Sequence, residues 1–425
     1  MRKIGVALLG LGTVGSGAYR ILKSERENIK KTYGIDIKVL HILEKDIDKV
    51  NALDIDHKIV STDINNVISN ADIKIVAEFF GGIEPARTFL LEALKAGKSI
   101  VTANKELFSK HWHEFEAEAA KTGAGLYFEA SCVGGVPIIR ALTESMQGNQ
   151  IQEIKGIING TTNYILTKMT KEGSSYEKAL KEAQELGYAE FNPSADVDGY
   201  DSMYKLSILS TLAYKRPVPI NKIYREGISK IKSEDISWGK ELGLTLKLLA
   251  ISKYSDGKIE ARVHPVFIPD SHPLSAVSDS FNAVDIIGNN VGELMFYGRG
   301  AGALPTGSAI VSDIVYAAGV TNHRRYPAVT SGKVKDQDFI ADFMSEYYIR
   351  LTVIDKPGVL HKLSGVFSKH NVSITSVNQR PGINLVPIIL ITHTTSENAI
   401  NKVLEEITAL AEVERIDSVI RVEKN

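Results

Sequence analysis

The chain has 425 residues, a formal net charge of −1 and a sequence pI of about 6.8. This length allows several domains with sizeable cores, and the near-neutral charge does not indicate binding to nucleic acid or to an anionic membrane. The single cysteine, Cys132, excludes an intramolecular disulfide and a cysteine-based zinc site. No apolar run approaches the length of a membrane span, so we expect a cytoplasmic protein.

A glycine-rich loop follows the first predicted strand. Residues 4–9 form a continuous apolar run, which is typical of a parallel strand buried on both faces. The run leads into Gly10-Leu11-Gly12-Thr13-Val14-Gly15, a G-x-G-x-x-G match that opens a helix predicted over residues 14–31. In this motif the glycines permit a tight turn, close approach of a pyrophosphate and close packing of helix on strand. The loop therefore predicts a dinucleotide site.

Further buried strands are predicted over residues 35–43, 73–80, 98–102 and 126–129, with helices between several of them. This alternation is typical of a Rossmann-type doubly wound sheet, which binds its ligand at the carboxyl ends of the strands. Asn104 and Lys105 follow one of these ends and are candidates to reach the ligand. The second strand ends at Glu44-Lys45. An acidic residue there favours NAD and a basic one favours NADP, so the cofactor is NADP or NAD.

A polar turn and an acidic stretch follow in the middle of the chain. Residues 151–158 alternate like a half-buried strand and run into Asn159-Gly160-Thr161-Thr162-Asn163-Tyr164. This donor-rich turn either holds a carboxylate or amide or simply caps a helix. Residues 188–205 then carry four carboxylates, Glu190, Asp196, Asp198 and Asp201, before Lys205.

Asp201 and Lys205 are four residues apart and would share one face of a helix. The carboxylates suit an ammonium group, and Lys205 stands at the border between a polar and an apolar surface, where it can meet a desolvated ligand. The alternative is an acidic loop that caps a solvated helix, with Lys205 as an ordinary partner of Asp201.

The remaining sequence predicts two further units. An apolar helix through residue 318 would return to the nucleotide-binding domain, which therefore spans residues 1–138 plus about 303–325, around a catalytic and dimerisation domain at 139–302. Residues 326–342 are polar and indicate a linker. Residues 343–425 predict the order βαββαβ of a small ferredoxin-like domain.

Together these motifs resemble homoserine dehydrogenase over roughly the first 320 residues. The resemblance is carried by residues 10–15, Thr102-Ala103-Asn104-Lys105, the turn at 159–164, the series from Gly187 to Lys205, and Gly300-Ala301-Gly302 with Pro305-Thr306. The C-terminal module resembles an ACT domain. The resemblance implies NAD(P)-dependent interconversion of L-aspartate 4-semialdehyde and L-homoserine, within threonine and methionine biosynthesis.

The resemblance also implies roles for individual residues, but none for Asp198. Lys205 would be the catalytic acid–base, and Lys105 a second lysine at the reacting centre. The expected substrate-binding residues are Glu190, Asp201, Asp196, Tyr188, Gly160 and Thr161. The expected cofactor contacts are Gly10, Leu11, Gly12, Thr13, Val14, Gly15, Thr102, Asn104, Lys105, Gly187 and Gly302.

Two binding sites beyond the reacting centre are implied as well. A monovalent cation, expected to be sodium, would be held by Glu129, Cys132, Gly134 and Val136, with the backbone oxygen as the ligand at Cys132. The ACT module implies control by an amino acid and at least a homodimer. Threonine is the first effector to test, near Asp355, Gly358 and Asn371.

Two other functions remain open from the sequence. An acylating semialdehyde dehydrogenase would use Cys132 as its nucleophile and would need a histidine to activate the thiol, for which His111 and His113 are nearest in sequence. That reaction leaves the series from Glu190 to Lys205 without a task. The second is an amino-acid-sensing protein without turnover, against which the intact glycine loop and lysines count.

Overall fold

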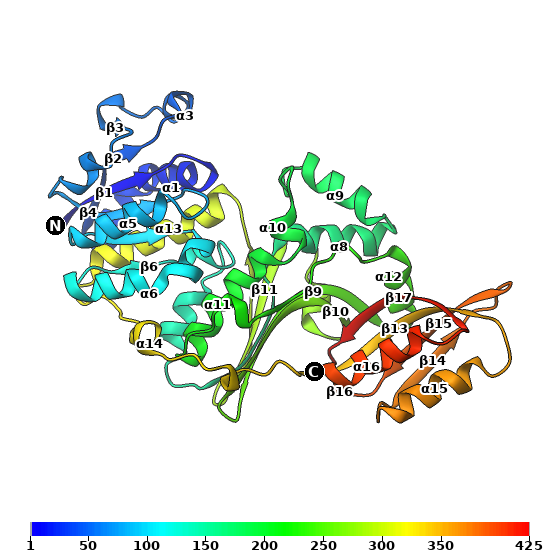
Figure 1. Ribbon diagram of the computed structural model, residues 1–425. Helices are drawn as coiled ribbons and strands as arrows, with labels where there is room; N and C mark the ends of the chain where they lie inside the picture. Colours follow the sequence, from blue (N-terminus) through cyan, green and yellow to red (C-terminus); the bar gives the residue numbers. More distant parts are fainter. Residues whose placement is uncertain (1, 425) are drawn as a thin grey trace.

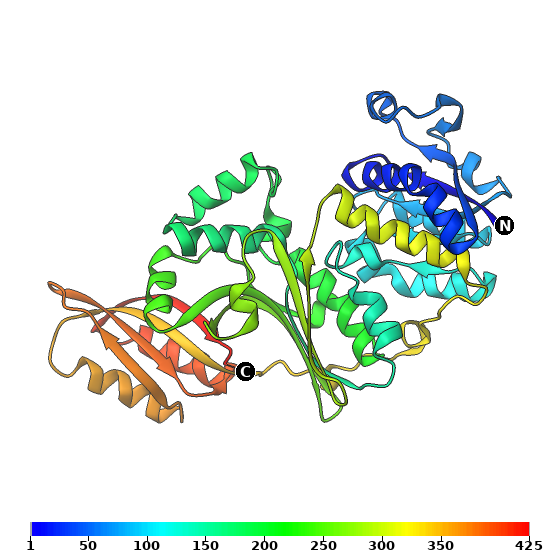
Figure 2. The same cartoon turned by 180° about the vertical axis from the view of Figure 1, so that it is seen from behind.

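The computed structural model describes residues 2–424. Three units lie in a row: an N-terminal α/β unit, a central α+β unit and a C-terminal module (Figures 1 and 2). Within the described range, no helix combines the length and the apolar character needed to cross a membrane.

The N-terminal unit is built on a parallel six-stranded sheet in the order β3-β2-β1-β4-β5-β6. Its strands are β1 (Arg2–Leu9), β2 (Ile35–Leu43), β3 (Val60–Ser61), β4 (Ile73–Glu78), β5 (Ser99–Thr102) and β6 (Leu126–Tyr127). This order confirms the Rossmann-type fold predicted from the sequence. The order reverses between β1 and β4, and ligands of such sheets bind at the carboxyl ends beside that point.

The helices of this unit cover both faces of the sheet. They are α1 (Thr13–Ser24), α2 (Arg26–Tyr33), α3 (Ile47–Ala52), α4 (Asn65–Ile68), α5 (Ala86–Lys95), α6 (Lys105–Thr122) and α13 (Ala303–Gly319). The single helix predicted over residues 14–31 is therefore two helices. The chain leaves helical geometry at Glu25, and the Ser24 hydroxyl donates to the carbonyl of Ile21 near the break.

Helix α13 returns from the central unit and packs on α1. A Cβ at Gly17 would lie 2.0 Å from the carbonyl oxygen of Ala303, and one at Gly307 would lie 2.8 Å from the nitrogen of Ala18. Only glycine permits so close an approach of the two helices. Ile310 and Ile314 of α13 are buried in the same core as Val6 of β1. Both helix N-termini thereby reach the same edge of the sheet.

The central unit contributes to a mixed eleven-stranded sheet whose path runs β12-β11-β7-β9-β10-β17-β13-β15-β14, with β8 paired to β10 and β16 to β13. Its own strands are β7 (Ile151–Ile157), β8 (Tyr224–Arg225), β9 (Leu244–Ser255), β10 (Lys258–Pro269), β11 (Phe281–Gly288) and β12 (Gly292–Arg299). Its helices are α7 (Ile138–Arg140), α8 (Gly160–Glu172), α9 (Tyr176–Glu185), α10 (Ser194–Val197), α11 (Tyr200–Tyr214) and α12 (Ser233–Glu241).

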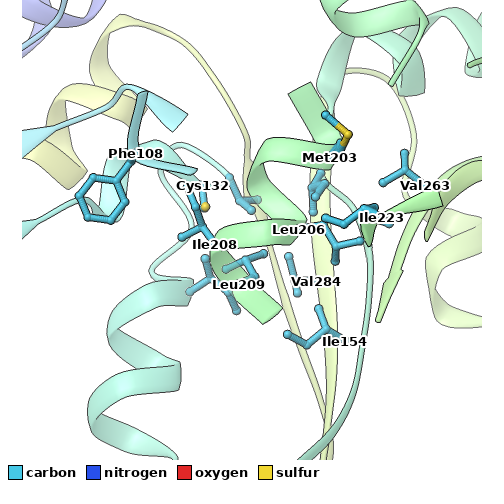
Figure 3. Packing of buried hydrophobic residues seen from close by; sticks show 14 of the residues in the cluster. Phe108, Cys132, Ile154, Met203, Leu206, Ile208, Leu209, Ile223, Val263 and Val284 are labelled. Carbon is cyan, nitrogen blue, oxygen red and sulfur yellow. The ribbon is translucent and has the colours of Figure 1, made fainter. Parts of the chain in front are cut away.

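Helix α11 is buried on nearly all sides because it lies between the N-terminal unit and the central sheet. Figure 3 shows Leu206 and Leu209 of α11 in one apolar cluster with Ile154 and Val284 of the sheet, and with Cys132. This packing fixes the helix that carries Asp201 and Lys205.

The C-terminal module has the predicted order βαββαβ. It consists of β13 (Met344–Ile354), α15 (Val359–Lys369), β14 (Ile374–Gln379), β15 (Leu385–Thr392), a short β16 (Thr395–Ser396), α16 (Glu397–Thr408) and β17 (Val413–Val422). The helices and the sheet enclose a core of their own, which includes Leu351, Phe367 and Ile400.

The module is joined to the central unit through its sheet. β17 runs parallel to β10, with Arg421 opposite Val266 and Val422 opposite Phe267, so the two sheets are continuous. The predicted linker is also attached along its path. It contains α14 (Pro327–Ser331), which packs on α6, and the Ile340 amide donates to the carbonyl of Ile259 at 2.8 Å.

Candidate active site

A cavity of about 540 Å³ opens where the carboxyl edge of the parallel sheet meets the central unit. Its walls come from the first residues of α1, α6, α8 and α13, from the loop after α9, and from α10 and α11. Its lining residues are Thr13, Val14, Ala103, Lys105, Ala130, Ser131, Gly134, Asn159, Gly160, Thr161, Leu186, Gly187, Tyr188, Asp196, Asp201, Lys205, Ser280, Arg299, Gly300, Ala301, Gly302 and Thr306.

Two lysines share one carboxylate in this cavity. Lys205 Nζ lies 2.6 Å from Asp201 Oδ2, and Lys105 Nζ lies 3.1 Å from Asp201 Oδ1. Lys205 also donates to the carbonyl of Ile158 at 2.7 Å. Lys205 and Asp201 are buried, whereas the side chain of Lys105 is 41% exposed. Lys105 therefore lies on the open side of the cavity and Lys205 at its floor.

Asn159 links the polar turn to the acidic stretch. Its Nδ2 donates to Asp196 Oδ1 at 2.6 Å and to Asp201 Oδ2 at 2.8 Å, while its Oδ1 accepts from the Thr162 amide and caps α8. The sequence left two alternatives for this turn, binding of a carboxylate or amide and capping of a helix. The Asn159 side chain does both. The sequence did not assign Asn159 to the site, and its position in a donor-rich turn was the only available signal.

The charges of the site are strongly coupled. Burial opposes ionisation of Asp201, but the ammonium groups of Lys205 and Lys105 hold its pKa well below the usual range. The negative charge of Asp201, against the cost of burial, raises the pKa of Lys105. Burial, together with the nearby charge of Asp201, raises the pKa of Asp196. Asp201 is therefore a permanent anion, and Lys105 keeps its proton into the alkaline range.

The glycine loop has free donors for an anionic ligand. Gly12 caps α1 without a side-chain hydrogen bond, and a Cβ at Gly12 would meet nothing within 4 Å. Gly10 adopts a positive φ of 100°, and a Cβ at Gly15 would lie 2.2 Å from the carbonyl oxygen of Gly10. These three positions match the turn, the open approach and the close packing that a dinucleotide requires.

Glu44 is directed at this loop. Its Oε2 accepts from the amide of Leu11 at 2.7 Å, and its Oε1 accepts from the amides of Lys45 and Asp46. The carboxylate therefore lies at the end of β2 beside the glycine loop, where dinucleotide folds place the group that meets the adenosine ribose.

Most of the predicted residues converge on the cavity, and some do not. Of the predicted cofactor residues, Thr13, Val14, Lys105, Gly187 and Gly302 line it, whereas Gly10, Leu11, Gly12, Gly15, Thr102 and Asn104 do not. Asn104 caps α6 and donates to the carbonyls of Phe80 and Gly82, while Thr102 donates to the buried Glu78.

Among the substrate residues, Asp196, Asp201, Tyr188, Gly160 and Thr161 line the cavity, whereas Glu190 does not. The Glu190 side chain is exposed and makes no ion pair with any residue in the range 2–424.

Arg299 and Ser280 also line the cavity, although the sequence did not mark them. Arg299 ends β12, and its guanidinium lies 5.2 Å from the ring centroid of Phe281. Across the described part of the chain it has no carboxylate partner, so it is available to an anionic group of a ligand.

The predicted cation ligands lie around a tight turn that borders the cavity at Gly134. Burial and the nearby Asp313 raise the pKa of Glu129 to about 7, although its carboxylate accepts from the amides of Ile139 and Arg140. Val133 and Gly134 both have a φ of 54°. Among residues 2–424 the carbonyls of Cys132 and Gly134 accept no hydrogen bond, whereas that of Val136 accepts from Ile138. A buried carboxylate and two free carbonyls fit a small cation in part.

Cys132 does not have the surroundings of a nucleophile. Its side chain is fully buried, and burial raises the pKa of the thiol to about 12. It lies in the apolar cluster beside Ile208 (Figure 3), and its hydrogen-bond partners are Ser131 and the carbonyl of Lys205. His111 is instead paired with Glu114 on α6. A reactive cysteine needs a lowered pKa and access, and this one has neither.

A second cavity lies in the C-terminal module. Its volume is about 310 Å³, and it is lined by the turn from β13 into α15, which contains Asp355 and Gly358, and by Gln379 of β14. Asn371, the third predicted effector residue, does not line it.

The fold and the site define an NAD(P)-dependent oxidoreductase with a lysine–carboxylate centre. Comparison with known families agrees with this class. The model of the homoserine dehydrogenase NAD-binding domain matches residues 10–129, that of homoserine dehydrogenase matches 137–315, and that of the ACT domain matches 347–412. The chain belongs to the homoserine dehydrogenase family.

Individual relatives span the whole chain. The homoserine dehydrogenase of Bacillus subtilis is 40% identical, covering 100% of this chain and 99% of that protein. The crystal structure of the enzyme from Thiobacillus denitrificans superposes with a TM-score of 0.93 at 38% identity, covering 100% and 99%. A hyperthermophilic archaeal homoserine dehydrogenase in complex with NADPH superposes with a TM-score of 0.64 at 28% identity. The match covers 76% of this chain and 100% of that protein.

Proposed function

We propose that the chain interconverts L-homoserine and L-aspartate 4-semialdehyde with NAD or NADP, within threonine and methionine biosynthesis. The observation that carries this is the pair of lysines on one buried carboxylate, Lys205 and Lys105 on Asp201, inside a cavity bordered by the glycine loop. Membership of the homoserine dehydrogenase family supports the identity of the substrate. The two lysines around a buried carboxylate support acid–base chemistry in this cavity.

Carboxylates orient the substrate. Asp201 and Asp196 would attract its α-ammonium group, and Asn159 keeps the two carboxylates together. Arg299 would attract its α-carboxylate. Holding both ends fixes the hydroxyl carbon relative to the lysines, which converts an encounter into an oriented reaction. Tyr188, Gly160 and Thr161 line the same cavity and would surround the bound substrate.

Lys205 moves the proton. During reduction of the aldehyde an alkoxide develops, and the Lys205 ammonium stabilises it and then protonates it. During oxidation a neutral Lys205 takes the proton from the hydroxyl, so oxidation is favoured at high pH. Lys105 remains an ammonium because Asp201 raises its pKa, and it stabilises negative charge on the reacting oxygen.

The residues around the glycine loop would hold the dinucleotide. The uncapped N-terminus of α1 and that of α13, which begins after Gly302 with a φ of 117°, would hold its phosphates. A bound nicotinamide dinucleotide supplies the hydride acceptor or donor at C4. Gly187 lines the same cavity and would also contact the dinucleotide, whereas Thr102 and Asn104 would support the loop that carries Lys105.

Two further sites complete the proposal. Glu129 with the backbone of Cys132, Gly134 and Val136 would hold sodium and brace the turn beside the cavity. The pocket of the ACT module would bind an amino acid, threonine first among those to test, in a homo-oligomer of at least two chains in the cytoplasm.

A direct assay tests the function. Purified protein with aspartate semialdehyde should oxidise NADH or NADPH, and with homoserine should reduce NAD⁺ or NADP⁺ faster at higher pH. Turnover of neither substrate would reject the proposal, and binding of amino acids without turnover would instead support a sensing protein.

A further inference from the structure

One of the contacts between the C-terminal module and the central unit is made by a nearly buried arginine, Arg421. Arg421 of β17 is 6% exposed. Its Nη1 donates to Glu226 Oε2 and its Nη2 to the Tyr224 hydroxyl, each at 2.9 Å, while its Nε donates to Glu397 of the module at 3.1 Å. The guanidinium also lies 4.7 Å from the ring centroid of Tyr224. Because the guanidinium is planar and rigid, its hydrogen bonds hold Glu226, Tyr224 and Glu397 in one relative geometry.

The partners of Arg421 in the central unit, Tyr224 and Glu226, belong to a short segment, residues 224–228, that begins with β8. β8 pairs with β10 just beyond the point where β17 pairs with the same strand. The Glu226 amide also donates to the carbonyl of Val263 at 2.8 Å. Residues 224–228 are therefore held between β10 and Arg421.

The opposite side of this segment supports the acidic stretch of the active site. Arg225 donates to the carbonyl of Asp198, and its guanidinium lies 3.6 Å from the ring centroid of Tyr200. The Ile228 amide donates to the carbonyl of Val197 at 2.8 Å. These contacts reach residues 197–200, which lie between Asp196 and Asp201 in the chain. They therefore hold the backbone that positions both carboxylates.

The contact leaves no space for independent movement. A Cβ at Gly227 would lie 2.3 Å from the carbonyl oxygen of Val197 and 2.6 Å from the Cα of Asp198. Close-packed surfaces transmit displacement because they cannot be compressed. A shift of residues 224–228 must therefore displace residues 197–198, or the hydrogen bonds between them must break.

We propose that Arg421 is a positioning residue of the substrate site, which it supports through residues 224–228. This rests on the proposed function in so far as Asp196 and Asp201 bind the substrate's ammonium group. Arg421 does not line the active-site cavity. Because it belongs to the module that carries the second cavity, a movement of β17 relative to β10 would reach the substrate carboxylates through this contact.

The test uses the full chain and three variants. R421Q removes the charged guanidinium, and E226A removes one of its acceptors, whose side chain is 36% exposed. R380Q is the matched control, because Arg380 also joins the module to the central unit, through Glu241 and Trp238, without touching residues 196–201. The KM for homoserine, kcat, and the hydrogen exchange of peptides spanning residues 194–203 are measured in each.

In R421Q and E226A we expect KM for homoserine to rise about tenfold and kcat to stay within about threefold, since ground-state positioning is lost. Exchange of residues 194–203 should become faster in the same two variants, while R380Q stays like wild type. Unchanged KM or unchanged exchange in E226A overturns the proposal. If the wild type does not oxidise homoserine, the proposed function fails, and the exchange measurement alone then decides the role of Arg421.

Discussion

Lys205 Nζ and Asp201 Oδ2 lie 2.6 Å apart on the same face of α11, one turn from each other. The pair is buried, and the carbonyl of Ile158 accepts a second hydrogen bond from the lysine. Asp201 therefore orients Lys205 toward the cavity and also binds Lys105 on the open side. A single carboxylate thus sets the position of both lysines.

Replacing Asp201 tests that arrangement. D201N keeps the size of the side chain but removes the charge that holds Lys205 and Lys105. We expect kcat/KM for homoserine to fall about 10²–10³-fold, as when one partner of a buried charge pair is lost. D198N is the control, because the Asp198 contact with Arg225 uses the backbone carbonyl. Equal activities of the two variants would contradict the role of Asp201.

Replacing Cys132 separates the two kinds of dehydrogenase. The thiol is buried with a raised pKa, so C132S should keep kcat within about threefold of wild type, as for a residue outside the chemistry. Steady-state kinetics with homoserine check this. Loss of activity together with a requirement for phosphate would support the acylating mechanism instead.

The cofactor preference should depend on Glu44. Its carboxylate faces the glycine loop and would repel a 2′-phosphate, so we expect the wild type to use NAD better than NADP. E44A should reduce this preference by about tenfold, and D48N, on the exposed first turn of α3, should not change it. A wild-type preference for NADP that E44A leaves unchanged would show that other residues select the cofactor.

Glu78 should make stability depend on pH. It is fully buried, and burial raises its pKa from 4.5 to about 7, while Thr102 donates to Oε2 and Oε1 has no partner among the described residues. Unfolded chains lose this proton near pH 4.5 and the folded protein near pH 7, so the stability present at low pH is lost as pH rises through this window.

E78Q removes this titration. Relative to wild type, its free energy of unfolding should increase by about 2–3 kcal/mol between pH 5 and pH 8. Urea unfolding of both proteins at the two pH values measures the difference. A gap between variant and wild type that is the same at both values would show that Glu78 stays ionised in the folded protein.

The sequence was sufficient where a feature is local. Gly10 to Gly15 and the spacing of Asp201 and Lys205 are read within one turn or one helix, and the order of buried strands predicted the fold class. Contacts between distant segments were not predictable. Asn159 meets Asp196 and Asp201 across 37 and 42 residues, and the polar character of the turn did not say which carboxylates it would bind.

The same limit explains the larger differences. β10 and β17 are far apart in the chain, so the sequence did not predict that they pair into one continuous sheet. The polar composition of residues 326–342 indicated a linker, but it did not predict that α14 within this segment packs on α6. Glu190 belongs to the acidic series by sequence, yet the loop after α9 leaves it exposed outside the cavity.

The activity of K205A tests the central claim most directly. Turnover of homoserine is measured beside K110A, a lysine of α6 paired with Glu106, and dinucleotide binding is followed by fluorescence. K205A should lose about 10²–10⁴-fold in kcat while it binds the dinucleotide like wild type, and K110A should remain active. Near-normal turnover by K205A would contradict the assignment of Lys205 as the acid–base.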